Sequence, residues 1–326
     1  MTVGFTYDSR SEYRKLGYRE EEIAEFDRDE TIDAIEEALK SYGLDVERIG
    51  GIRSLTEKLA AGKRWDFVFN ICEGMYGYGR EAAVPALLDA YRIPYVFSDA
   101  FVLALTLHKG MTKAVVQAAG VPTAESWVVA SRGDLDKVPD RFPLFAKPIA
   151  EGSGKGVHPH SVIQSRAELE RVALDLVQMF GQPALVEKYL PGKECTVGVI
   201  GNGLDTRVIG VDEIVFGGGV ESGGDTFLNK QSGAGKIVQK PVEGGLADKC
   251  ADIALRAYRA LGCRDCGRID IRCDENGEPF FLEINPLPEL NPADSEICLI
   301  AANAGTDYRR FMASILDTAL LRMGKK

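Results

Sequence analysis

Two neighbouring segments decide the fold of this chain: Gly267-Arg268-Ile269-Asp270-Ile271 and, after a short turn, Phe280-Phe281-Leu282-Glu283-Ile284-Asn285-Pro286. Both alternate with the period of a β-strand, and Asp274-Glu275-Asn276-Gly277 between them is turn sequence, so they predict a β-hairpin. The alternation puts Asp270 on one face of its strand, and Glu283 with Asn285 on one face of the next. We expect these oxygen ligands to share a surface that suits Mg²⁺. A solvated hairpin face is the alternative, and Arg268 beside the trio favours a site.

The composition describes a soluble globular protein of more than one domain. The 326 residues are 45% hydrophobic and 27% charged, and the net charge of −10 argues against a nucleic-acid partner. No apolar run is long enough to span a membrane, and the first residues lack a signal-peptide pattern. Seven scattered cysteines suit reduced thiols in a cytoplasm. The spacing of Cys263 and Cys266 resembles a zinc site, but no second pair completes it, so structural cysteines are favoured.

The first hundred residues alternate strands and helices, as in a Rossmann-like α/β module. The expected strands are Val3–Tyr7, Leu44–Ile49, Trp65–Ile71 and Ile93–Phe97, and the expected helices are Asp29–Tyr42, a short helix opened by a capping box at Ser54–Glu57, and Glu81–Tyr91. Ligands of such sheets gather at the carboxyl ends of the strands, here the loop Cys72–Arg80. The charged segment Ser9–Arg28 is too polar for a core, and a surface helix and a lid both remain open.

The middle of the chain carries two glycine-rich segments. Strands are expected at Glu125–Ala130, Leu144–Pro148, Ala184–Leu190 and Cys195–Ile200, with a helix at Ser165–Met179. Glu151-Gly152-Ser153-Gly154-Lys155-Gly156 follows the strand that carries Lys147, and its N–H groups could approach phosphates closely; a plain glycine hairpin is the alternative. The segment from Phe216 to Gly235 predicts a mobile lid rather than a linker, because it contains Phe216 and Phe227 and strands flank it.

Five motifs resemble, in their order along the chain, those of ATP-grasp ligases, and most closely those of the D-alanine–D-alanine ligase family. They are Lys147, the loop Glu151–Gly156, Val186–Leu190 with Glu194, Gly267–Asp270, and Glu283–Asn285; Ile93-Pro94-Tyr95, Ser98 and Lys109 also fit the join between that family's first two domains. The similarity runs from about residue 65 to residue 307. Each motif alone is weak evidence for the family, but five motifs in the same order are specific evidence for it.

The resemblance implies a fold and an activity. The fold is ATP-grasp: an N-terminal α/β domain (1–107) precedes two α+β subdomains (108–185 and 186–326) that sandwich ATP, with a mobile loop over 216–235. The activity is ATP-dependent amide formation between small amino acids or amines through an acyl phosphate, as in cell-wall dipeptide synthesis. The cofactors are ATP and Mg²⁺, for which Mn²⁺ could substitute, and a homodimer is left open.

The resemblance also assigns roles to residues. Asp270, Glu283 and Asn285 hold Mg²⁺, Arg268 stabilises charge on the transferred group, Ser153 lies at the tip of the glycine loop, and Lys230 reaches the γ-phosphate. The expected nucleotide-binding residues are Lys109, Lys147, Glu151, Gly152, Ser153, Gly154, Glu187, Lys188, Tyr189, Leu190 and Glu194. Among them, Glu187 is expected to read the adenine amino group, and Glu194 the ribose.

The chain departs from the family pattern where the amino-acid substrates should bind. Glu73 replaces the histidine of a His-Gly loop, Glu289 replaces a glycine that faces the reacting carbonyl, and Asp294 or Ser295 falls where a serine takes the second amino acid's carboxylate. An acidic side chain repels a carboxylate, which disfavours D-alanine as second substrate. Alternatively, Asp294 caps a helix and leaves Ser295 to bind the carboxylate. His108 stands where the family commonly has an aspartate, and Gln231 stands where it commonly has a tyrosine. The candidates to bind the ammonium group of the first substrate are Glu25 and Glu30.

Three functions remain open from the sequence. The first is a carboxylate–amine ligase, which joins either two D-alanines or other amino acids or amines. The departures from the family pattern at the substrate site favour other amino acids or amines. The second is a nucleotide-binding protein without ligation activity, which Arg268, the metal ligands and Lys230 argue against. The third is a dinucleotide-dependent oxidoreductase, but the first strand carries only Gly4 and lacks the glycine fingerprint.

Overall fold

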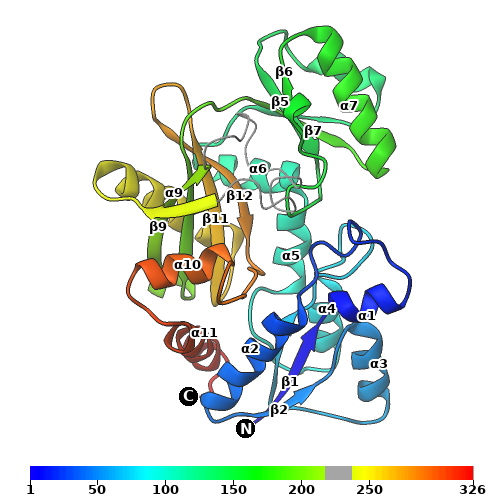
Figure 1. Ribbon diagram of the computed structural model, residues 1–326, viewed down its shortest axis with the longest axis vertical. Coiled ribbons are helices and arrows are strands. Elements are labelled where there is room, and N and C mark those ends of the chain that lie inside the picture. Colours follow the sequence, from blue (N-terminus) through cyan, green and yellow to red (C-terminus); the bar gives the residue numbers. More distant parts are fainter. Residues whose placement is uncertain (217–236, 326) are drawn as a thin grey trace.

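The computed structural model of the protein describes residues 1–216 and 237–325 and contains three β-sheets (Figure 1). The first sheet is parallel, with β1 (Thr2–Tyr7) between β2 (Asp45–Arg48) and β3 (Phe67–Ile71). Every residue of β3 is buried, as expected for an apolar strand inside a parallel sheet. Helices α2 (Asp29–Ser41), α3 (Ile52–Ala60) and α4 (Ala83–Ala90) complete this α/β module.

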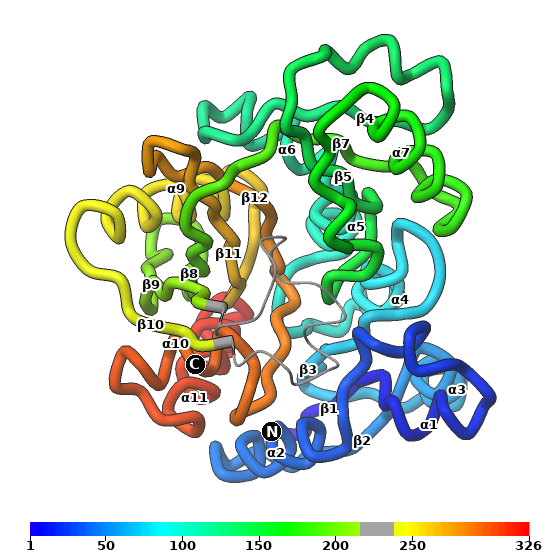
Figure 2. The backbone as a smooth tube through the Cα atoms, turned by 45° about the horizontal axis from the view of Figure 1, so that its top comes forward, coloured from blue at the N-terminus to red at the C-terminus, as the bar shows by residue number. Residues whose placement is uncertain are grey.

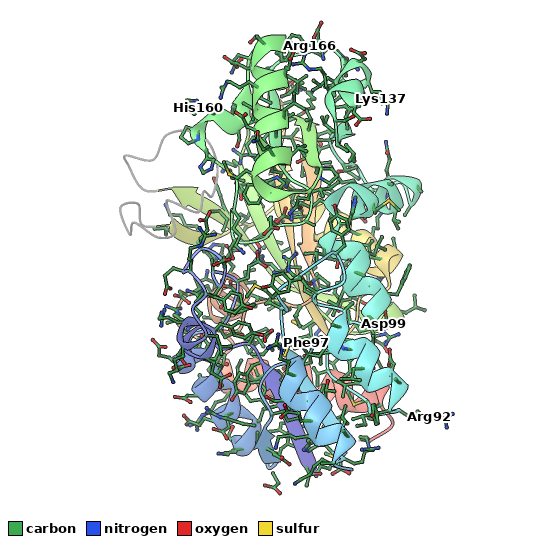
Figure 3. The ribbon with its side chains drawn as sticks, turned by 90° about the vertical axis from the view of Figure 1, so that its right-hand side faces the viewer. Arg92, Phe97, Asp99, Lys137, His160 and Arg166 are labelled. Atoms are coloured by element: carbon green, nitrogen blue, oxygen red, sulfur yellow. The ribbon has the colours of Figure 1, made fainter. Side chains whose placement is uncertain are left out.

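Two local predictions in this module are wrong. The expected strand Ile93–Phe97 reduces to a single parallel bridge between Tyr95 and Val68. Phe97, labelled in Figure 3, has φ 74°. Its N–H donates to Asp265 Oδ2 at 2.8 Å, so the chain turns away from the strand direction there. The capping box at Ser54 does not form, because α3 begins at Ile52 with Gly51 as its N-cap.

The charged segment Ser9–Arg28 contributes to the core after all. It contains the short helix α1 (Arg10–Lys15) and a series of turns, and it buries Ile23 at 0% exposure and Phe26 at 2%. The expectation that the segment is too polar for a core is therefore wrong for these two side chains. Glu25, in the same segment, reaches the glycine loop described below.

The second sheet is small and antiparallel, with strand order β4-β7-β5-β6. Helices α5 (Ala100–Leu107) and α6 (Lys109–Ala118) lead into it from the first sheet (Figure 1). Its elements are β4 (Ser126–Val129), β5 (Leu144–Pro148), β6 (Val162–Ile163), α7 (Arg166–Phe180) and β7 (Ala184–Lys188), with short 3-10 turns at Arg132–Lys137 and Pro159–Ser161. One face of α7 packs on the sheet through Leu169, Val172 and Leu176.

The third sheet is antiparallel, with strand order β10-β9-β8-β11-β12, and contains the predicted hairpin. Asp270 pairs with Glu283 and Arg268 pairs with Asn285 across it, so the side-chain alternation is as predicted. The elements are β8 (Glu194–Ile200), a 3-10 turn (Gly203–Asp205), β9 (Arg207–Phe216), β10 (Ile237–Pro241), α9 (Gly245–Leu261), β11 (Cys266–Cys273) and β12 (Pro279–Asn285). Helix α9 covers the face that carries Ile269 and Ile271.

The C-terminal helices return to the first sheet. Helix α10 (Glu296–Asn303) leads to α11 (Tyr308–Arg322), which packs beside α2 and brings the two termini to the same end of the molecule (Figures 1 and 2). Phe311 and Ile315 of α11 belong to the same hydrophobic core as Phe5 and Phe69. None of the helices in the described part of the chain has the length and apolar character needed to cross a membrane. All seven cysteines are free and buried.

Candidate active site

A cleft lies between the second and third sheets. It encloses about 1110 Å³ including its open mouth, which is ample for a small-molecule ligand. Strands β5 and β7 form one wall, and β11 and β12 form the other. All eleven residues expected at the nucleotide line this cleft, together with Arg268, Asp270 and Glu283. The residues come from five separate stretches of sequence and meet in one place.

A buried ion network supports one wall of the cleft. Glu187 is 2% exposed, and its carboxylate lies 2.5 Å from Lys113 Nζ and 3.5 Å from Lys147 Nζ. Burial raises the pKa of Glu187, but the two lysines more than offset this and hold it below its ordinary value. Both carboxylate oxygens are inaccessible. In this arrangement Glu187 lines the cleft and neutralises two lysines, and its contact with the adenine amino group stays a prediction.

Glu283 and Asp270 meet cations in the middle of the cleft. Glu283 Oε2 lies 3.0 Å from Lys147 Nζ and 3.8 Å from Lys109 Nζ, and these lysines hold the pKa of Glu283 below its usual range despite burial. Asp270 lies 3.0 Å from Arg268 Nη2 and accepts from Thr196 Oγ1 at 2.9 Å. Arg268 also contacts Glu296 at 3.0 Å. Positive charges for a phosphate chain therefore lie beside the carboxylates that a cation would need.

The predicted metal ligands fit Mg²⁺ by their chemistry. Asp270 and Glu283 lie opposite each other on β11 and β12, and Asn285 follows two residues later on the same strand. Asn285 Oδ1 accepts only a local bond, from the N–H of Leu287 at 3.3 Å. Two carboxylates and an amide are the hard oxygen ligands that Mg²⁺ takes beside phosphates. The described residues contain no cluster of three or more His, Cys, Asp or Glu that could hold a metal, and the expected site instead combines two carboxylates with the amide of Asn285.

The rim of the cleft is more open. The Lys188 side chain is 49% exposed and lies 3.7 Å from Glu275, whereas Leu190 is buried. Arg272 lies over the ring of Tyr189 at 5.9 Å and contacts Glu194 at 2.8 Å. Tyr189 and Glu194, expected at the adenine and the ribose, are thus positioned by an arginine.

The glycine loop is tied to the N-terminal module through Glu25. Its carboxylate accepts from the Gly152 N–H at 3.0 Å and contacts Lys155 at 3.1 Å and Arg80 at 2.8 Å. Burial raises the pKa of Glu25, but Arg80 and Lys155 lower it to about 2. Gly156 needs to be glycine because its φ is 74° and a Cβ there would lie 2.5 Å from Pro148. Glu25, considered for a substrate ammonium, thus contacts the loop, and its role at the substrate stays a prediction.

A second cavity adjoins the cleft and is acidic. The two share Lys109, Glu151, Gly152, Ser153 and Glu283. The residues that the second cavity adds include Glu289 and six from the first 107 residues: Glu25, Glu73, Arg80, Glu81, Thr106 and Leu107. Asn285 lines it as well. Glu73 and Glu289, both expected near the substrates, therefore lie in one cavity beside the glycine loop.

Three other expected residues lie elsewhere. Asp294 pairs with Arg28 at 2.5 Å on the surface, and Ser295 is 1% exposed and accepts from the Asn291 N–H at 2.7 Å. Ser295, not Asp294, is the N-cap of α10, so the alternative in which Asp294 caps the helix is wrong. Neither residue lines the two cavities. Glu30 is exposed and lines neither of them, and Lys230 and Gln231 fall outside the described residues.

Comparisons with known proteins identify the family to which the chain belongs. Residues 115–317 match the family model described as the D-Ala–D-Ala ligase C-terminus. A D-alanine–D-alanine ligase of Bordetella avium is 32% identical over 89% of this chain and 89% of its own length. The chain belongs to the D-alanine–D-alanine ligase family.

Two further relatives and one solved structure are also similar to this chain. Sinorhizobium fredii has a D-alanine–D-alanine ligase 30% identical over 88% of this chain and 90% of its own. The same organism has an uncharacterised protein, y4sG, that is 34% identical over 77% of this chain and 74% of its own. The D-alanine–D-alanine ligase of Bacillus anthracis, solved in complex with ATP, covers 100% of both chains with a TM-score of 0.74 at 21% identity. The fold is therefore ATP-grasp.

Sequence reasoning missed several residues of this ligase-family site. Lys113 pairs with Glu187, Arg272 positions Tyr189 and Glu194, and Glu296 contacts Arg268. Lys113 sits four residues after Lys109 on α6 and so lies on the same helix face, which is the one signal that could have identified it. Arg272 follows Asp270 at the strand period and shares its face.

Proposed function

We propose that the protein is an ATP-dependent carboxylate–amine ligase that forms an amide through an acyl phosphate. The observation that carries the proposal is the single cleft that holds all eleven nucleotide residues and opens into an amino-acid-sized acidic cavity beside the glycine loop. Membership of the D-alanine–D-alanine ligase family supports it independently. The substrates are small amino acids or amines.

The first step is phosphoryl transfer. A substrate carboxylate oxygen forms a bond to the γ-phosphorus of ATP, the bond to the bridging oxygen breaks, and ADP leaves. Lys109, Lys147 and Arg268 line the cleft where negative charge accumulates, and such preset charges are the main contribution a protein makes to this chemistry. Asp270, Glu283 and Asn285 would hold Mg²⁺, which would further neutralise the phosphate oxygens.

The second step is amide formation. The amine nitrogen bonds to the acyl carbon, the bond to the phosphate oxygen breaks, inorganic phosphate leaves, and the nitrogen loses a proton. Because the acyl phosphate reacts with water, the site must stay closed during the reaction. Glu25 holds Gly152 and Lys155 over the junction of the two cavities and limits the access of water there.

The second substrate need not be D-alanine. Sinorhizobium fredii has both a named D-alanine–D-alanine ligase and y4sG, and this chain is 30% identical to the first and 34% to the second. The second candidate is a family member with a different amine acceptor, which is favoured by Glu73 and Glu289 in the cavity beside the glycine loop. Whether the protein is a homodimer stays a prediction.

The test is phosphate release with ATP and Mg²⁺ in the presence of D-alanine and a panel of amines, with products identified by mass spectrometry. We expect release that depends on both an amino acid and ATP, with a product heavier than the amino acid. ATP hydrolysis without any condensed product from any amine would overturn the ligase assignment. Binding of ATP with no turnover would leave the nucleotide-binding alternative.

A further inference from the structure

Arg268 lies between two carboxylates that come from different elements of the fold. Its Nε donates to Asp270 Oδ1 at 3.1 Å and its Nη2 to Asp270 Oδ2 at 3.0 Å, and the same Nε lies 3.0 Å from Glu296 Oε2. The side chains of Arg268, Asp270 and Glu296 are only 14%, 13% and 18% exposed. One cation is therefore held by two acids where little water screens the charges. The function proposed above uses Arg268 and Asp270 and gives Glu296 no role.

Helix α10, and not the hairpin, brings Glu296 to this place. Glu296 is the first residue of α10, directly after the N-cap Ser295, and its side chain lines the nucleotide cleft. The next residues, Ile297 and Cys298, fix the helix in the hydrophobic core that it shares with α11. The helix dipole favours an acidic side chain in this first turn. The Glu296 carboxylate is thus held independently of the hairpin that carries Arg268.

Asp270 has two roles in the proposed site, and they compete. Both of its carboxylate oxygens accept from Arg268, and Oδ1 also accepts from Thr196 Oγ1 at 2.9 Å. Asp270 is also an expected ligand of Mg²⁺, and an oxygen that binds a metal ion gives up part of its bonding to Arg268. Glu296 is not among the expected metal ligands. It can therefore stay in contact with Arg268 when Asp270 turns to the metal ion.

The Nη1 end of Arg268 is left for the nucleotide. Among the described residues, the hydrogen bonds and ion pairs of Arg268 use only Nε and Nη2. Arg268 lines the cleft together with Lys109 and Lys147, where the phosphates are expected. A guanidinium is planar, so contacts that hold its Nε edge also set the direction of its remaining N–H donors. Donors that stabilise a transition state must be held in place before the reaction.

We propose that Glu296 is a positioning residue for phosphoryl transfer: it holds the Nε edge of Arg268 while Asp270 binds the metal ion, and so keeps the Nη1 donors in place for the transferred phosphoryl group. The inference deepens the proposed function and rests on it. Glu296 acts through Arg268, so its loss should slow the chemical step more than it weakens the binding of ATP.

The first test is Glu296→Gln, which removes the charge and keeps the size of the side chain. Phosphate release with Mg²⁺ in excess should show kcat lowered about tenfold or more, since a charge-assisted hydrogen bond contributes that much. The KM for ATP should stay within about threefold of wild type. Thermal unfolding checks that the variant folds. A raised KM with unchanged kcat would overturn the inference, because Glu296 would then contact a substrate and not position Arg268.

The second test is a double-mutant cycle that needs no turnover. Calorimetry measures Mn²⁺ binding to the protein with the non-hydrolysable analogue AMP-PNP, less the heat of Mn²⁺ with AMP-PNP alone, for wild type, Glu296→Gln, Arg268→Met and the double variant. Without Glu296, Arg268 has only Asp270 as its partner, so Glu296→Gln should weaken Mn²⁺ binding about tenfold. In the Arg268→Met background the same change should weaken it less than about threefold. Equal losses in both backgrounds would overturn the inference, because long-range charge would explain them.

The two tests separate this inference from the function on which it rests. A wild-type protein that releases no phosphate with any acceptor, but shows the expected cycle in Mn²⁺ binding, would contradict the ligase assignment and support the contact of Glu296 with Arg268 as the positioning contact. A protein that ligates, with kcat unchanged by Glu296→Gln, would overturn the inference and leave the ligase in place.

Discussion

The two adjoining cavities differ in whether a lysine or arginine contacts their acidic residues. In the nucleotide cleft every acidic residue on the described walls contacts a lysine or arginine: Glu151, Glu187, Glu194, Asp270, Glu283 and Glu296. In the neighbouring cavity Glu73, Glu81 and Glu289 contact none that the structure describes. The carboxylates of the cleft are thus paired with cations, and a phosphate or a metal ion can take the place of either partner. The neighbouring cavity instead has a net negative charge. We interpret the cleft as a phosphate site.

The largest effect should come from the pair buried deepest in the cleft. Replacing Lys113 by Met leaves Glu187, at 2% exposure, with Lys147 alone at 3.5 Å. Removing one partner of a buried ion pair costs about 3–5 kcal/mol. We expect the free energy of unfolding of Lys113→Met, measured with denaturant, to fall by about this amount.

The double variant Lys113→Met with Glu187→Leu is the matched control for this pair. It removes both charges and should recover most of the lost stability, because no buried charge is left unpaired. Equal destabilisation in the single and double variants would mean that packing, and not charge pairing, sets the cost.

Glu283→Gln should abolish most activity and leave the fold intact. The amide keeps the shape of the side chain but loses the charge that faces Lys147 and Lys109 and that would bind Mg²⁺. By analogy with the removal of one preset electrostatic group, kcat should fall on the order of 10²–10³-fold. Phosphate release at several Mg²⁺ concentrations measures this, and thermal unfolding controls for the fold. Normal Mg²⁺-dependent turnover would remove Glu283 from the metal site.

The hairpin and the cleft could be predicted from the sequence because their signals are local. The alternation around Asp270 and Glu283 sets their shared face, and the observed pairing of Asp270 with Glu283 follows from it. The partner of Glu187 could not be predicted in this way, since Lys113 lies on a helix 74 residues earlier in the chain. Likewise, only tertiary packing shows that Ile23 and Phe26 fill a core and that Glu25 reaches the glycine loop.

The predicted strand at Ile93–Phe97 failed for a similar reason. Its apolar residues are buried as expected, but pairing ends after one bridge because Phe97 turns to donate its N–H to Asp265, 168 residues away. Asp294, expected near the second substrate, pairs with Arg28 of the N-terminal segment and lines neither cavity. In the strand, a long-range polar contact overrides the local pattern.

Stability against pH should separate paired from unpaired carboxylates. The pKa of Glu25 is lowered to about 2 in the folded protein. Its contribution to the free energy of unfolding is therefore present above the unfolded pKa of 4.5 and is lost as the pH falls towards 2. The pKa of Glu81, which lies near Arg80, Lys109, Glu25 and Glu73, is raised to about 7, so its contribution is present below 4.5 and is lost as the pH rises through 7. The two residues therefore have opposite slopes.

The matched variants Glu25→Gln and Glu81→Gln test this difference by denaturant unfolding between pH 4 and pH 8. At pH 8, Glu25→Gln should be less stable than the wild type and Glu81→Gln more stable, each on the order of 1–3 kcal/mol. Near pH 4.5 the gain in Glu81→Gln should vanish. Changes of the same sign in both variants at pH 8 would contradict the distinction between paired and unpaired carboxylates.

The smallest effect should come from Asp294→Ala. Asp294 is the acidic residue that the sequence placed near the second substrate, but its side chain is 57% exposed, lies outside both cavities and pairs with Arg28, itself 42% exposed. Exposed ion pairs contribute about 0–1 kcal/mol and are screened by salt. We expect kcat/KM for each acceptor to stay within about twofold of wild type, and the small loss of stability to disappear in about 0.5 M salt. A large change in acceptor preference in Asp294→Ala would return this residue to the second-substrate site.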